Sequence, residues 1–258
     1  MTPTSKAVTR LREALRLETP LLALYDATPT EEFEPLVRLR GSSCCFSYYT
    51  RWLRGETLVA AKAADPDDKP RHGCPAALRF LGLDERGTPD WMANKLTDGE
   101  EGPGRGEGLK ASPELAKDFL DGAETPSSES GFVLLGPLRL ERWDAVRSVT
   151  FFVDPDRLSA LITLASYWSS DADQIGAPFS SGCGLLWRDL EASGDKALIA
   201  CTDLAMRKYL PPQILGFTVS ASRFAQLLEV PDDSFLRKSW WKQLLDYRAK
   251  YGDAAFVD

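Results

Sequence analysis

Short apolar runs alternate with helical patterns along the chain, and this alternation predicts a fold that contains both strands and helices. The apolar runs are rich in β-branched and aromatic residues, which is typical of buried strands. We expect strands near 21–25, 57–61, 132–135, 148–153, 197–200 and 214–219. The predicted fold class is therefore α+β, or α/β, with a mixed β-sheet covered by helices in a single globular domain over residues 1–258.

Apolar residues at helical spacing predict the helices that cover this sheet. The main helices are expected at 5–16, 156–168, 221–229 and 234–250. Asp154 and Pro155 form a strong start signal for the second of them. Thr202 is the expected N-cap of a further short helix after the strand at 197–200. Strands and helices thus alternate through the second half of the chain.

Two polar segments are predicted to be flexible loops. One lies near 99–110 and contains GEEGPGRGEG, and the other lies near 121–130. The first superficially resembles a phosphate-binding glycine loop, but no predicted strand leads into it, and no helix with a suitable lysine and hydroxyl follows it. Neither segment carries the apolar anchors that would offset the entropy of ordering, so surface loops are favoured.

Composition and charge narrow the list of partners. No apolar run reaches the roughly 20 residues that a membrane helix needs, and the amphipathic N-terminal segment lacks the apolar core of a signal peptide. The formal net charge of -7 repels phosphate backbones, and no basic block offsets it. We therefore expect a cytoplasmic protein that binds neither nucleic acid nor a membrane, while an oligomer stays open.

Cysteines carry the candidate chemistry, at Cys44, Cys45, Cys74, Cys183 and Cys201. In a cytoplasmic chain they favour free thiols or metal ligands over a disulfide framework. Cys183 lies in a glycine-flanked turn, and Cys201 lies where a strand ends and a helix begins. We expect Cys74, Cys183, Cys201 and one of Cys44 or Cys45 to converge on one crevice, within about 10 Å, as a metal or cluster site would require.

The most suggestive short motif is His72-Gly73-Cys74-Pro75. Pro75 suits the first position of a helix, so Cys74 would be the N-cap, near the positive end of the helix dipole. That position favours the thiolate and makes Cys74 a candidate nucleophile, with His72 as a candidate catalytic partner. The alternative is that Cys74 only packs as a small apolar residue beside the helix start.

Aromatic and charged residues supply candidates for a small-molecule site. The aromatic residues expected to line a crevice are Trp187, Phe179, Tyr167 and Trp168. Asp203 and Arg207 are four residues apart on one predicted helix face, where they form either a functional pair or an ordinary ion pair. The single histidine excludes every metal site that needs two imidazoles.

Several segments, taken in order, match a known family pattern: LREALRLETPLLAL, GCPAALRFLGL, GPL, FFVDPDRLSALITLASY and CTDLAMRKYLPPQILGFTVSASRF. Together they resemble the domain of unknown function 169 (DUF169) family, also called the archaeal conserved region (ArCR) family. The resemblance implies that the cysteines near 44–45, 74, 183 and 201 occupy positions that the family often fills with cysteine. It implies no activity, and the glycine-rich insertion departs from the family pattern.

Three functions are open on this basis, so the sequence does not decide whether the protein is an enzyme. The first is a small-molecule or cofactor-binding module with an aromatic and cysteine-lined crevice. The second is a thiolate metal or iron–sulfur redox protein that uses Cys44 or Cys45 with Cys74, Cys183 and Cys201, although the sequence lacks a tight C-x-x-C pair. The third is a cysteine-nucleophile enzyme with Cys74 as the nucleophile.

Overall fold

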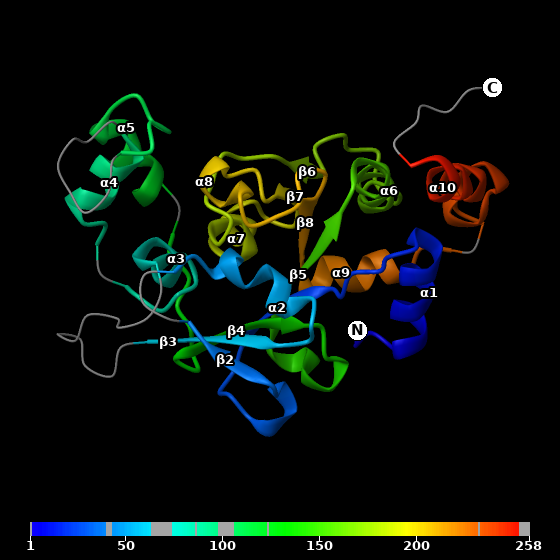
Figure 1. Ribbon diagram of the computed structural model, residues 1–258, viewed down its shortest axis with the longest axis horizontal. Coiled ribbons are helices and arrows are strands. Elements are labelled where there is room, and N and C mark those ends of the chain that lie inside the picture. Colours follow the sequence, from blue (N-terminus) through cyan, green and yellow to red (C-terminus); the bar gives the residue numbers. More distant parts are fainter. Residues whose placement is uncertain are drawn as a thin grey trace.

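A mixed β-sheet runs through the molecule (Figure 1). The computed structural model describes residues 2–39, 43–62, 74–85, 87–97, 106–122, 124–231 and 233–252. Within these ranges the sheet has eight strands, in the order β2-β3-β4-β1-β5-β8-β7-β6. The strands are β1 (Leu22–Asp26), β2 (Leu36–Arg38), β3 (Thr57–Ala61), β4 (Phe132–Pro137), β5 (Val146–Val153), β6 (Ile175–Gly176), β7 (Ala197–Ala200) and β8 (Leu215–Ser220).

Strand pairing explains why the sheet is mixed. The two outer pairs, β2 with β3 and β6 with β7, are parallel, and the neighbouring pairs between them are antiparallel. Strand β1 lies between β4 and β5, and all five of its residues are buried. Ala23 and Tyr25 belong to one hydrophobic cluster, whereas Leu22 and Leu24 belong to another. Because side chains alternate along a strand, these two clusters lie on opposite faces of the sheet.

Long helices cover the first face. They are α1 (Ser5–Leu15), α6 (Pro155–Ala165), α9 (Ala221–Leu228) and α10 (Ser239–Tyr251), which Figure 1 shows together on one side of the molecule. Leu15, Leu161 and Phe224 from three of these helices are fully buried against Phe151 and Phe217 of the sheet. This face therefore has a closed apolar core.

Shorter elements cover the second face. The α-helices here are α2 (Tyr49–Trp52), α3 (Pro75–Phe80), α7 (Arg188–Ala192) and α8 (Leu204–Arg207), with α4 (Asp90–Leu96) and α5 (Pro113–Asp121) farther from the sheet. Among the described residues the 3-10 turns are η1 (Glu31–Phe33), η2 (Cys45–Tyr48), η3 (Leu140–Ala145), η4 (Gly184–Leu186) and η5 (Phe235–Arg237). Of these, η2 and η4 pack on the second face. A small separate cluster, with Phe80, Met92 and Leu120, joins α3, α4 and α5.

The predicted α+β fold with a mixed sheet and covering helices is confirmed. Each of the expected strands is present within two residues of its predicted limits, whereas β2 and β6 were missed because they are only three and two residues long. The helix expected at 234–250 begins at Ser239, because the preceding residues form η5. The N-cap expected at Thr202 is Asp203, whose side chain accepts a hydrogen bond from the Ala205 N–H at 2.9 Å.

Both segments predicted to be flexible loops are partly described. Residues 98–105 and 123 lie outside the described residues. In the described part, Glu107 and Leu109 donate backbone hydrogen bonds to the carbonyl oxygens of Lys95 and Leu96 at 2.7 and 2.8 Å. The flexibility of these loops and the single-domain organisation stay predictions. In the ranges that the structure describes, none of the helices has the length and apolarity to cross a membrane.

Candidate functional site

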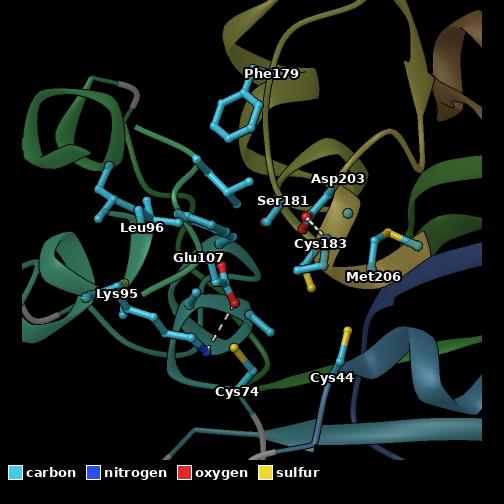
Figure 2. Close-up of a pocket in the computed structure, with 18 of the residues that line it drawn as sticks. Cys44, Cys74, Lys95, Leu96, Glu107, Phe179, Ser181, Cys183, Asp203 and Met206 are labelled. Carbon is cyan, nitrogen blue, oxygen red and sulfur yellow. Dashed lines mark hydrogen bonds and ion pairs between the residues drawn. The ribbon is translucent and has the colours of Figure 1, made fainter. Parts of the chain in front are cut away.

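A cavity of about 280 Å³ lies between α8, the turn before η4, and the helices α3, α4 and α5 (Figure 2). Its walls are largely aromatic and aliphatic, with rings from Phe80, Trp91, Phe119 and Phe179. The charged residues that line it are Lys95, Glu107, Asp203 and Lys208. Three thiols, from Cys44, Cys74 and Cys183, also face it. The cavity therefore combines an apolar wall with a few polar groups and sulfur atoms.

Arg188 holds the far wall of the cavity in place. Its guanidinium is buried, pairs with the Asp189 carboxylate at 2.6 Å and donates to the Leu120 carbonyl oxygen at 3.2 Å. The guanidinium carbon also lies 3.9 Å from the ring centre of Phe80. Arg188 thereby links α7 to α3 and α5 through an ion pair, a hydrogen bond and a cation–π contact, which together satisfy a buried charge.

Two wall residues of the cavity, Phe119 and Phe179, share a second cation–π contact. The Lys110 ammonium lies 4.7 Å from the ring centre of Phe119 and 4.4 Å from that of Phe179. The two rings are 5.1 Å apart, and the Phe179 side chain is 43% exposed. Phe179 lines the cavity as the sequence suggested, and with Trp91, which is 47% exposed, it is a wall residue that a ligand can contact from solvent.

Two cysteines that are far apart in sequence meet at the floor of the cavity. The Cys45 Sγ lies 2.9 Å from the Cys183 Sγ, and both side chains are buried. Gly182 permits this approach, because a β-carbon there would clash with the Met206 sulfur and lie 2.7 Å from the Phe46 ring. The structure therefore separates the two adjacent cysteines: Cys45 contacts Cys183, whereas Cys44 faces the cavity.

The thiols of this group differ in acidity. A hydrogen bond with Cys45 lowers the pKa of Cys44, burial opposes this, and the backbone N–H of Phe46 adds to the lowering, so that the pKa is about 7. The hydrogen bonds to Cys183 and Cys44, together with burial, raise the pKa of Cys45 well above its usual value. The bond from Cys45 lowers the pKa of Cys183, but burial and nearby groups raise it overall. Cys44 is thus the most readily ionised of the three.

The remaining two cysteines have different surroundings. Cys74 lines the cavity and is the N-cap residue of α3, with Pro75 at the first helical position as predicted. Cys201 is fully buried after β7 in the left-handed conformation, with φ 64°, and burial raises its pKa to about 12. As far as the described residues define the cavity, Cys201 lies outside its lining. The expected convergence therefore brings Cys44, Cys74 and Cys183 to the cavity, with Cys45 directly behind them.

The expected metal site gains no support from this arrangement. In the described ranges, no group of three or more His, Cys, Asp or Glu residues is placed to hold a metal ion. All five candidate ligands, Cys44, Cys45, Cys74, Cys183 and Cys201, are free cysteines in the structure, and metal binding by them stays a prediction.

Of three other candidate residues, one lines the cavity and two have different surroundings. Asp203 lines the cavity, and its burial raises the pKa of the carboxyl although the N–H groups of Ala205 and Gly182 lower it. Trp187 is buried away from the lining, and its indole N–H donates to Glu191 at 2.5 Å. Arg207 donates to the carbonyl oxygens of Cys201, Ile214, Pro211 and Pro212 rather than forming an ion pair with Asp203 in the described structure.

Three further residues have other placements. Tyr167 and Trp168 are exposed residues beyond the end of α6, where their rings form an edge-on pair with centres 5.0 Å apart. They are not part of the cavity lining formed by the described residues. His72 lies outside the described residues, so its suggested partnership with Cys74 stays a prediction.

Several lining residues were missed by the sequence analysis. Trp91 and Lys95 come from α4, and the Lys95 ammonium lies 3.6 Å from the Glu107 carboxylate, which Figure 2 marks. The helix signal was present, because Pro89 and Asp90 are typical of a helix start. Only the tertiary fold, however, shows that this helix lies across from α8.

Comparison with known proteins gives one match. A model of the DUF169 family, described as uncharacterised ArCR, matches residues 10–230. The matched segment includes every described residue that lines the cavity, from Ser43 to Tyr209. Neither the curated proteins nor the solved structures contain a match.

Proposed function

We propose that this chain, which belongs to the DUF169 family, is a small-molecule-binding protein whose ligand occupies the cysteine-lined cavity. The observation that carries this proposal is the composition of the cavity wall. Apolar and aromatic walls with a few convergent polar groups are typical of ligand sites. We further propose that the protein is cytoplasmic and binds neither nucleic acid nor a membrane.

The cavity limits the class of ligand. Its volume of about 280 Å³ lies just below the range of about 300–1,000 Å³ that is common for ligand pockets, so the ligand is compact. Rings from Phe119 and Phe179 favour a flat apolar body. Lys95, Glu107 and Asp203 offer one positive and two acidic partners for its polar end. A small aromatic or unsaturated molecule with one polar group fits this combination.

A binding experiment with compact aromatic probes tests the proposal. Benzoate, 1-naphthoate and 1-naphthylamine are each added to the reduced protein while thermal unfolding is followed. A probe at ten times its Kd stabilises a folded protein by about 1.4 kcal/mol, which raises Tm by about 3–5 °C for a domain of this size. We expect at least one probe to produce this shift.

A pair of tryptophan variants supplies the control. Ala76 lines the cavity, so Ala76→Trp fills it, whereas Leu204→Trp adds the same side chain at a position that is 74% exposed. We expect Ala76→Trp to lose the probe-induced shift and Leu204→Trp to keep it, while both retain the far-UV circular dichroism spectrum of the wild type. Equal shifts in both variants, or no shift in the wild type with any probe, would overturn the proposal.

A further inference from the structure

The floor of the cavity contains a thiol group whose chemistry goes beyond binding. We propose that Cys45 and Cys183 form a redox-active dithiol, which is oxidised by a low-molecular-weight disulfide that enters the cavity and is first attacked by Cys44. This inference rests on the proposed function, because the disulfide must occupy the same cavity as the ligand. It makes the cavity a site of thiol–disulfide exchange.

The first support is the direct contact of the two sulfurs. Cys45 and Cys183 are 138 positions apart in the chain, yet their Sγ atoms are 2.9 Å apart. Disulfide formation requires β-carbons that already face each other, since otherwise the backbone must move. Two buried sulfurs in contact meet the requirement of proximity with little rearrangement. Figure 2 shows the Cys183 sulfur pointing toward the side of the cavity where the Cys44 sulfur lies.

The second support is that both turns are held by their own contacts. On one side, the Cys44 carbonyl oxygen accepts from the Ser47 N–H at 3.0 Å and from the Ser47 hydroxyl at 2.7 Å. On the other side, the Gly184 N–H donates to the Ser181 hydroxyl at 3.1 Å. Phe46 packs directly against Gly182, which joins the two turns. The approach of the sulfurs is therefore part of the packed structure.

Access to the cavity assigns different roles to the thiols. Cys44 and Cys183 line the cavity, whereas Cys45 lies behind them. The attacking species in exchange is a thiolate, and Cys44 has the lowest pKa of the three, at about 7. The raised pKa values of Cys45 and Cys183 keep these two protonated near neutral pH. Cys44 is thus the thiol that first reacts with the incoming disulfide, and Cys45 and Cys183 supply the two electrons.

The exchange balances without any further oxidant. The Cys44 thiolate attacks the disulfide RSSR, which breaks its S–S bond, forms a mixed disulfide Cys44–S–S–R and releases the thiolate RS⁻. Cys183, which also lines the cavity, then loses its proton and attacks the Cys44 sulfur, which breaks the Cys44–S–S–R bond, forms a Cys44–Cys183 disulfide and releases the second RS⁻. Cys45 in turn loses its proton, attacks the Cys183 sulfur and releases the Cys44 thiolate. Exchange within the group leaves the disulfide on Cys45 and Cys183, because their sulfurs are in contact and Cys44, with the lowest pKa, is the best leaving thiolate.

The net reaction transfers two electrons. Cys45 and Cys183 are oxidised to one disulfide, RSSR is reduced, and the protons of the two thiols pass to the two RS⁻ ions to give two RSH. Cys44 returns to its starting form. An aromatic disulfide is the substrate class that best matches the rings of Phe119 and Phe179.

One equivalent of 4,4′-dithiodipyridine, added to the reduced full chain, tests this inference. Internal disulfide formation releases two thiopyridones per protein, leaves no pyridyl group attached and lowers the protein mass by two hydrogens. We expect this result, with Cys45 and Cys183 joined in the peptide map. One thiopyridone for each modified thiol, with the pyridyl group retained, would overturn the inference, and so would a map that joins other cysteines.

Three variants assign the roles. Cys183→Ala removes one member of the pair, so we expect one thiopyridone and a pyridyl adduct that persists on Cys44. Cys44→Ser should slow the release of thiopyridone at least tenfold. Cys201→Ala is the control, because Cys201 lies outside the described lining, and we expect the wild-type rate and stoichiometry. A Cys44→Ser protein that reacts at the wild-type rate would contradict the role of Cys44.

The outcome separates this inference from the proposed function. A protein that is stabilised by the aromatic probes but forms only pyridyl adducts retains the binding function and loses the exchange function. A protein that forms the Cys45–Cys183 disulfide but responds to none of the probes loses the binding proposal and keeps the exchange function, because the disulfide then needs only to reach Cys44 in the cavity and not to remain bound there. The mass measurement on the wild type needs no variant to fold.

Discussion

The two faces of the sheet are built in different ways. Helices of eight to thirteen residues cover the first face and bury Leu15, Leu161 and Phe224 completely. The helices directly against the second face, α2, α3, α7 and α8, have four to six residues, and turns fill the spaces between them. Long amphipathic helices present a continuous apolar stripe to the first face, whereas short helices and turns from several parts of the chain cover the second. The cavity and the thiols lie on the face with the short helices.

This contrast indicates a division of labour between stability and function. The first face resembles an ordinary apolar core, in which every deleted atom leaves a void. The second face also has a packed apolar cluster, around Phe46 and Trp52, and in addition it carries a buried ion pair, the contacting sulfurs and the cavity. Substitutions on the two faces should therefore separate the free energy of unfolding from ligand binding.

The largest expected effect is a large-to-small substitution on the first face. Phe151 is buried, and its ring centre lies 5.9 Å from Phe224 and 6.3 Å from Phe217. We expect Phe151→Ala to lower the free energy of unfolding by about 3–5 kcal/mol in urea titrations. Phe179→Ala on the cavity wall should cost less than about 1 kcal/mol but abolish stabilisation by the aromatic probes. Equal losses of stability in both variants would remove the distinction between the faces.

The next effect concerns the buried charge on the second face. Arg188→Met leaves the Asp189 carboxylate without its ion-pair partner and removes the contact with Phe80. We expect a loss of about 3 kcal/mol in urea titrations, because breaking a buried pair leaves an uncompensated charge. Arg51→Met is the matched control, since Arg51 forms an exposed pair with Glu56 and should change stability by less than about 0.5 kcal/mol. A loss below about 1 kcal/mol for Arg188→Met would mean that this link does not hold the wall.

A smaller effect is expected at Gly182. Gly182→Ala forces a β-carbon against Phe46 and Met206, so we expect a loss of about 1–3 kcal/mol in urea titrations and slower formation of the Cys45–Cys183 disulfide. Gly87→Ala is the control, because a β-carbon there meets no atom within 4 Å. If Gly182→Ala forms the disulfide at the wild-type rate, the contact of the two turns is not what brings the sulfurs together.

The smallest effect is a shift in reactivity with pH. Because the thiolate is the reactive form, alkylation of Cys44 by iodoacetamide should rise with pH through a midpoint near 7, whereas Cys45 and Cys183 should react only at higher pH. The charged groups that share the cavity are Asp203, Glu107, Lys95 and Lys208. Peptide mapping after brief alkylation measures each thiol. Labelling of Cys44 that begins only above pH 8.5 would contradict the assigned acidity.

More of the fold than of the candidate site could be predicted from the sequence. Residues such as Ala23 and Tyr25 follow strong local patterns, since an apolar run bounded by turns already identifies a buried strand. The short strands β2 and β6 and the shift of the N-cap from Thr202 to Asp203 depend on tertiary contacts, which local patterns do not contain.

Only part of the candidate site could be predicted from the sequence. The chemistry of the cysteines was visible, but Cys44 and Cys45 are adjacent, and only packing distinguishes the cavity-facing thiol from the one that contacts Cys183. Trp187 was expected in the lining because it is aromatic, yet it is buried in the hydrophobic cluster of the second face. Lys95 and Glu107 were overlooked because no local motif marks them. In each of these cases, the position of the residue depends on how segments that are distant in the sequence pack together.

The most direct test of the central claim is a crystal structure of the reduced protein with 1-naphthoate. We expect the aromatic body of the probe to lie between Phe119, Phe179 and the Cys44 thiol, with its carboxylate near Lys95. We also expect the Cys45 and Cys183 sulfurs to stay in contact beneath the probe. A probe bound elsewhere, or a cavity that stays filled by water at saturating probe, would contradict the claim that the second face of the sheet is a ligand site.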